Sequence, residues 1–172
     1  MTGVQTCALP IWETPREDPG DPQYLTYRAS RALAVGRVDA ADEDIQAALR
    51  MEPGNSDALA LQAVIFVVQN DKPKALEAAQ KAVAADPDSA AAHIALSYAQ
   101  QAGFDLDGAL ASVQTAVNRD PDNALAWARL AELQASFGRL SKALNAARRA
   151  TELEPDLSRT QMVLGFAYLT QV

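Results

Sequence analysis

His93 is the one histidine in the 172-residue chain, and Ser97 follows it one helical turn later. A serine beside a histidine could supply the nucleophile and base of a hydrolase, but a spacing of four is common on any helix. The sequence contains no Gly-x-Ser-x-Gly turn and no glycine-rich phosphate loop. A metal site would need more ligands than one histidine and one cysteine, Cys7. We therefore interpret His93 as a ring packed between helices, and predict no enzyme activity, catalytic residue, cofactor or metal.

Two clusters of charge lie far apart in the sequence. The acidic cluster is Asp39, Asp42, Glu43 and Asp44, and the basic cluster is Arg139, Lys142, Arg148 and Arg149. Carboxylates at the start of a helix lie favourably near the positive end of its dipole, so we interpret the first cluster as a solvated face. The basic cluster is read the same way, with docking of an acidic partner as the open alternative.

The overall composition excludes two classes of partner. A net charge of -7 and a pI near 4.6 argue against the basic face that nucleic-acid binding requires. The longest apolar run, residues 63–68, is far shorter than the roughly 20 residues that span a bilayer. We therefore predict neither nucleic-acid binding nor membrane insertion.

Five prolines recur at a constant interval of 34 residues: Pro19, Pro53, Pro87, Pro121 and Pro155. Each follows an acidic residue and precedes Gly or Asp. A period of this length is typical of stacked helix-turn-helix units, which form an elongated array and not one closed globule. Alanine-rich composition with few aromatic residues, 6% of the chain, favours helix throughout.

The period divides the chain into four full units and a partial fifth: 22–55, 56–89, 90–123, 124–157 and 158–172. Alanine occupies the twentieth position of every full unit (Ala41, Ala75, Ala109, Ala143) and the twenty-seventh (Ala48, Ala82, Ala116, Ala150). The twenty-fourth position is apolar but varies in size: Ile45, Ala79, Val113 and Ala147. We predict that the invariant alanines are close contacts between two helices and that the twenty-fourth residues are core.

Local signals set the helix boundaries of the second unit. A first helix from about Asp57 to Gln69 would be capped by Asn55 or Ser56. A second helix would start at Pro73, which the first turn tolerates, and would end near Ala85 because Pro87 cannot continue it. In the other units the turn between the two helices is predicted at Gly36, Gly103 and Gly138.

Residues 22–172 resemble a tetratricopeptide repeat array. The fourth unit carries the residues this family favours at Trp127, Leu130, Ala131, Ala143, Ala150 and Pro155, and the fifth carries Leu164, Gly165 and Tyr168. The first unit departs from the family at Leu25, Arg28 and Ala32. The resemblance implies an all-α, right-handed superhelix of four full repeats plus one terminal helix. It also implies that the first helix of each repeat lines a concave groove, and that the protein is a non-catalytic interaction scaffold binding a protein or peptide segment.

The ligand-facing positions of the family map onto a mostly uncharged groove. The candidate residues are Thr26, Ser30, Asp57, Val64, Val67, Ile94, Tyr98, Gln101, Glu132, Arg159, Met162 and Phe166. The family's chaperone-tail clamps use Lys, Arg and Asn at such positions, and only Arg159 matches, so we predict that the chain is not a carboxylate clamp. The apolar candidates suit an apolar or amphipathic segment of a partner. The open alternative is that they pack against the adjacent repeat.

The two ends of the chain carry separate expectations. Residues 1–11 resemble the translation of a sequencing adapter, with the stump of a secretory signal as the weaker alternative, and residues 12–21 are typical of a linker. We expect the true N-terminus to be missing, which leaves bacterial cytoplasm and periplasm both open. The fifth unit stops after an apolar helix, so we expect a truncated gene and self-association through that helix. An alternative function is a docking or spacer arm of a larger bacterial envelope-associated protein, because residues 22–172 resemble repeat regions found downstream of a FecR-type domain.

Overall fold

The computed structural model describes residue 18 and residues 20–170, and within them the chain forms nine α-helices and no strand. The helices are α1 (Pro22–Ala34), α2 (Val38–Met51), α3 (Ser56–Val68), α4 (Lys72–Ala85), α5 (Ala90–Ala102), α6 (Leu106–Arg119), α7 (Ala124–Ser136), α8 (Leu140–Leu153) and α9 (Ser158–Leu169). Turns of three residues join the two helices of a pair, and turns of four residues join successive pairs. The adapter-like residues 1–11 and most of the predicted linker lie outside the described residues.

Side-chain caps explain where the helices begin. Asn55, Ser89 and Asn123 precede α3, α5 and α7, and each accepts a hydrogen bond from the backbone N–H three residues later. In the second unit α4 holds Pro73 in its first turn and ends at Ala85. These boundaries agree with the prediction from the sequence, because both caps and proline act through the local backbone.

The turns inside the helix pairs share one left-handed residue. It is the fifteenth residue of each unit, namely Gly36, Asn70, Phe104 and Gly138, with φ between 59° and 76°. Gly103 lies in the third turn, as predicted, but it has a φ of -81°, and the next residue, Phe104, takes the left-handed conformation. The constant length of the turn fixes which position is left-handed, whether or not that position holds glycine.

The core consists mainly of alanine. All eight alanines at the twentieth and twenty-seventh positions are at most 1% exposed, and the four residues at the twenty-fourth position are fully buried. The prediction of the twenty-fourth residues as core is confirmed, and the burial of the eight alanines agrees with close contacts between helices. Small side chains let neighbouring helices approach closely, so the repeated alanines set the spacing of the stack.

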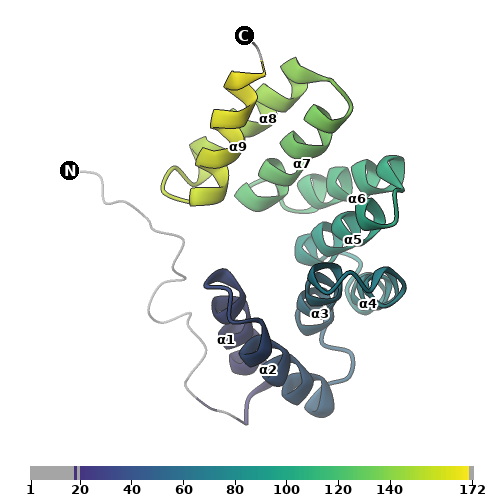
Figure 1. Cartoon of the computed structure of the whole chain (residues 1–172). Helices are drawn as coiled ribbons and strands as arrows, with labels where there is room; N and C mark the ends of the chain where they lie inside the picture. The colour runs from purple at the N-terminus through teal and green to yellow at the C-terminus, as the bar shows by residue number, and fades with distance from the viewer. Residues whose placement is uncertain (1–17, 19, 171–172) are drawn as a thin grey trace, which may run out of the picture.

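The helix pairs stack into an arc with the odd-numbered helices on its inner side (Figure 1). Among the described residues, each odd-numbered helix from α1 to α9 contacts the next odd-numbered one, whereas successive even-numbered helices do not touch. The contact between α3 and α5 is more extensive than that between α5 and α7. The predicted all-α solenoid of helix pairs is confirmed, and its inner face belongs to the first helix of each repeat.

Candidate functional site

A buried arginine lies at the seam between α5 and α7. Arg129 is 3% exposed, and its Nε donates to Ser97 Oγ at 2.8 Å. Its Nη2 donates to the Ser97 carbonyl at 3.1 Å and to Gln101 Oε1 at 2.7 Å. The guanidinium carbon also lies 3.8 Å from the centre of the Tyr98 ring, a cation–π distance. Arg129 therefore joins two inner helices through directional contacts.

Two further charged side chains extend this contact to α9. Glu132 accepts from Arg129 Nη1 at 3.1 Å and pairs with Arg159 Nη2 at 2.5 Å. Arg159 also donates to the Tyr98 hydroxyl at 2.6 Å. We call Ser97, Tyr98, Gln101, Arg129, Glu132 and Arg159 the inner polar cluster. The cluster therefore ties three repeats together. Because Ser97, Gln101 and Glu132 already accept from Arg129, its guanidinium is not offered to a free carboxylate.

The environment of Tyr98 keeps its hydroxyl protonated. Burial raises the pKa of Tyr98, and the charge of Glu132 raises it further, while Arg159 and Arg129 act in the opposite direction. A neutral phenol can accept from Arg159 and still donate to a bound molecule.

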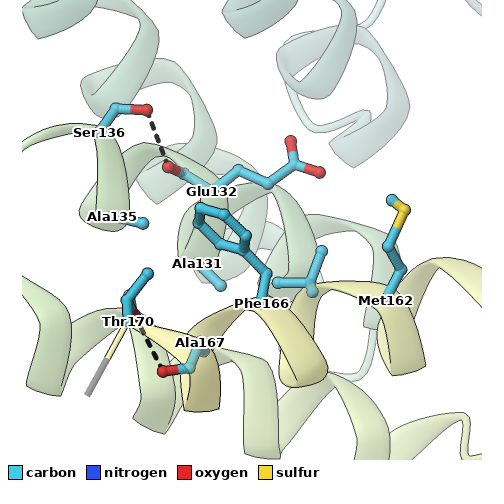
Figure 2. Close-up of a pocket in the computed structure, with 10 residues that line it drawn as sticks. Ala131, Glu132, Ala135, Ser136, Met162, Phe166, Ala167 and Thr170 are labelled. Atoms are coloured by element: carbon cyan, nitrogen blue, oxygen red, sulfur yellow. Dashed lines mark hydrogen bonds between the residues drawn. The ribbon is translucent and has the colours of Figure 1, made fainter. Parts of the chain in front are cut away.

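Beside the cluster, a hollow of about 410 Å³ opens between α7 and α9. Its lining is Ala131, Glu132, Ala135, Ser136, Ala143, Met162, Val163, Phe166, Ala167 and Thr170. Figure 2 shows Phe166 and Met162 projecting from α9 towards the side of the hollow on which Glu132 lies. Most of the lining is apolar, and both of these side chains are more than half exposed. The hollow has the size and character of a site for a bulky apolar side chain.

The structure brings together six of the twelve candidate groove residues. Tyr98, Gln101, Glu132 and Arg159 belong to the inner polar cluster, while Met162 and Phe166 share the hollow with Glu132. Both kinds of contact lie at the C-terminal half of the arc.

The other six candidates neither belong to the inner polar cluster nor line the hollow. Val64, Val67 and Ile94 are half-buried and pack against the hydrophobic core. The hydroxyls of Thr26 and Ser30 donate to carbonyls of their own helix, at Pro22 and Tyr27. Asp57 is in the first turn of α3, where partial burial and, secondarily, the charge of Asp86 raise the pKa of its carboxyl group.

Arg129 was not among the residues predicted for the groove, and Ser97 was considered only as a nucleophile beside His93. The predicted groove residues occupy the second, fifth, ninth and twelfth positions of their units, whereas Arg129 is the sixth residue of its unit. The sixth residues of the other units are Tyr27, Leu61, Ala95 and Val163. Arg129 is thus the one charged residue at a position that is apolar or aromatic in the other units. This difference could have indicated a special contact, because a buried charge requires dedicated partners.

His93 belongs to a repeated contact with the preceding turn. The fourth residues of the last three units, His93, Trp127 and Gln161, each place a side-chain nitrogen 2.6–3.0 Å from the carbonyl of the proline near the end of the preceding unit. Ser97 points instead to Arg129. His93 thus has a structural contact, although this contact is with a turn and not the interhelical packing we predicted.

The acidic and basic clusters differ in their bonding. Asp44 is buried and pairs with Arg28 through two hydrogen bonds, at 2.6 Å and 2.5 Å, so the solvated-face interpretation is wrong for this member. That pairing raises the pKa of the Arg28 guanidinium. Arg149 reaches Asp122, while Arg148 lies over the Tyr168 ring.

Two kinds of feature are absent from the described residues. In this part of the chain no group of three or more His, Cys, Asp or Glu side chains is placed to hold a metal ion. None of the helices described is both long and apolar enough to cross a bilayer.

An arc of stacked helix pairs with a structured inner face defines a helical-repeat protein of the kind that serves in protein interactions. Two family models, each described as tetratricopeptide repeat, match residues 28–90 and 99–165. The chain belongs to the tetratricopeptide repeat family, as its resemblance in sequence indicated. No curated protein gives a significant sequence match.

Solved structures share this fold. TTC0263, a thermophilic TPR protein of Thermus thermophilus, is 24% identical with a TM-score of 0.75, and the match covers 89% of this chain and 84% of that one. A MamA protein is 22% identical with a TM-score of 0.58, covering 87% and 82%. The O-GlcNAc transferase of Thermobaculum terrenum is 26% identical with a TM-score of 0.65, covering 74% of this chain but 26% of the transferase.

Proposed function

We propose that the chain is a non-catalytic scaffold that binds a protein or peptide segment along its inner face. A bulky apolar side chain of that segment enters the hollow between α7 and α9. The observation that carries this proposal is the exposure of Phe166 and Met162 around an alanine-lined hollow, beside a rigid polar cluster. Membership of the tetratricopeptide repeat family supports a role in protein interaction in general.

The inner polar cluster favours a preformed site. Arg129 fixes α7 against α5, and the pair of Arg159 with Glu132 fixes α9 against α7. A groove whose walls are already ordered avoids much of the entropy lost when a flexible surface binds. The partly exposed Arg159 and Glu132 offer polar contacts to the backbone of the bound segment.

A pocket-filling variant tests the proposal. Peptides selected from a random twelve-residue library on the immobilised protein are expected to contain a bulky apolar residue, and Ala135→Trp should weaken their binding at least about tenfold by filling the hollow. Ala111→Trp places the same side chain on an exposed position of α6 and serves as the matched control. Binding that survives Ala135→Trp unchanged would place the site elsewhere, and an absence of selected peptides would argue against peptide recognition.

A second candidate function is that of a docking or spacer arm within a larger bacterial envelope-associated protein that carries a FecR-type domain. The comparison that favours an arm is the O-GlcNAc transferase structure, in which the matching region makes up only 26% of the chain. Sequencing the complete open reading frame tests it, because the arm requires a further domain beyond residues 1–172.

A further inference from the structure

The inner polar cluster has used most of its hydrogen-bond acceptors and kept several donors. Glu132 accepts from Arg129 through Oε2 and pairs with Arg159 through Oε1. The side-chain oxygen of Gln101 accepts from Arg129. Among the described residues, no acceptor is bonded to the Tyr98 O–H, to the amide N–H groups of Gln101, or to Nε and Nη1 of Arg159. A molecule bound to this cluster therefore meets mainly donors, and it satisfies them only with acceptors of its own.

The cluster also carries an excess of one positive charge. One anion and two cations act on the hydroxyl of Tyr98: Glu132, Arg159 and Arg129. Arg129 is buried, whereas the side chain of Arg159 is 38% exposed, so the excess charge is accessible at Arg159. At about 0.15 M salt, exposed charges more than about 8 Å apart are largely screened from each other. The local excess, and not the net charge of -7, therefore decides which charge a bound group carries.

The exposure of Arg159 belongs to its position in the repeat. Arg159 is the second residue of its unit and lies in the first turn of α9. The second residues of the four full units are exposed although a further repeat stacks on each: Gln23, Asp57, Ala91 and Leu125. A position that stays exposed between stacked repeats is available to a partner on the inner face.

We propose that Tyr98 and Arg159 bind an acidic side chain, Asp or Glu, of the segment that lies along the inner face. This inference rests on the proposed function and adds the chemistry that the segment contains. The hydrogen bond from Arg159 Nη2 to the Tyr98 hydroxyl holds the two side chains together. The Tyr98 O–H then donates to one oxygen of the carboxylate, and Nε or Nη1 of Arg159 donates to the other. A neutral amide replaces the carboxylate poorly, because it has one acceptor oxygen and no charge.

The distance to the hollow sets the place of the acidic residue in the segment. Arg159, Met162 and Phe166 follow one another on α9 at intervals of three and four residues, so they share one face of the helix. At a rise of about 1.5 Å per residue, Arg159 lies roughly 5–10 Å along α9 from the two side chains at the hollow. An extended segment covers that distance in about two or three residues, which is the expected spacing between its acidic and its bulky apolar residue.

Selection from the random twelve-residue library on the immobilised full chain tests this inference. The selected peptides should contain Asp or Glu at a constant distance from the bulky apolar residue. Selection on Arg159→Gln should return peptides that keep the apolar residue and lose the acidic one. Arg149→Gln is the matched control, since Arg149 is 41% exposed and lies on the even-numbered helix α8, and its peptides should stay acidic. Apolar peptides without an acidic preference on the wild-type chain would overturn this inference alone, whereas an absence of peptides would overturn it together with the proposed function.

Binding measurements on one selected peptide separate a side-chain carboxylate from a terminal one. Replacing its acidic residue with the corresponding amide should weaken binding to the wild-type chain at least about tenfold, because charge-assisted hydrogen bonds are lost. The same replacement should change binding to Arg159→Gln by less than about threefold, because the two partners act as one unit. Tyr98→Phe removes the second donor alone and should also reduce the effect of the replacement, and circular dichroism confirms the fold of both variants. If amidation of the peptide's C-terminus abolishes binding while the internal replacement does not, the ligand is a terminal carboxylate and the inference fails.

Discussion

Replacing Arg129 with methionine removes the centre of the inner polar cluster at nearly constant volume. The substitution deletes the donors to Ser97, Gln101 and Glu132. Ser97 Oγ and Gln101 Oε1 then lose a partner at the α5–α7 seam. Glu132 does not lose its only cation, because Arg159 still pairs with it.

The expected loss follows from these partners. Hydrogen bonds to a charged group contribute about 1.5–3 kcal/mol each, and breaking a buried ion pair from one side costs about 3–5 kcal/mol. The four hydrogen bonds are not additive, and Glu132 keeps its second cation, so we expect Arg129→Met to lower the free energy of unfolding by about 2–4 kcal/mol.

Urea unfolding followed by circular dichroism measures this change, and hydrogen exchange locates it in α5, α7 and α9. Arg149→Met is the matched control: Arg149 is 41% exposed and its partner Asp122 is 84% exposed, so the loss should stay within about 0.5 kcal/mol. If Arg129→Met costs less than about 1 kcal/mol, or no more than the control, then the cluster does not stabilise the seam and the reasoning fails.

Three further predictions concern single positions. Gly138→Ala should destabilise the protein by about 1–2 kcal/mol because Gly138 has a φ of 68°. Gly54→Ala should instead stabilise the protein by about 0.4–1 kcal/mol, because a Cβ at Gly54 would meet no atom within 4 Å. Thermal melts of both variants measure these changes. Gln134→Leu should raise the free energy of unfolding in urea by about 1 kcal/mol, since the buried Gln134 Oε1 has no hydrogen-bond partner among the described residues. Burial raises the pKa of Tyr98 above its ordinary value of 10.0, so above that pH the unfolded chain releases a proton that the folded chain retains. Stability measured in urea should therefore fall with rising pH from about pH 10, and less steeply in Tyr98→Phe.

Most of the fold could be predicted because the period of the sequence is the period of the structure. The same two alanines recur in each unit and are buried in each, so four independent copies support one interpretation. The turns were less predictable. Phe104 adopts a left-handed φ of 66° that residue type disfavours, because the three-residue turn imposes it.

The candidate site could be predicted only in part. Position along a repeat gives the direction of a side chain, which is why Glu132, Met162 and Phe166, predicted to face the same way, line one hollow. Direction does not say how far the surrounding chain covers that side chain. Thr26 is buried, although Met162, which holds the same fifth position in its unit, is exposed.

Arg129 shows a further limit that lies in the physics of the contact. The partners of Arg129 lie on α5, across the seam, so they depend on how far its long side chain reaches and on the width of the seam. Alanines at other positions determine that width, and the sequence of a single repeat does not give it. Near this seam the hydrophobic core also divides, since most of the buried alanines of α5 pack with α3 and α4, while those of α7 pack with α6, α8 and α9. Apolar packing allows small sliding movements, whereas the donors of Arg129 accept one geometry. The arginine therefore fixes the register between two otherwise separate parts of the core, and with it the position of the α7 wall of the hollow.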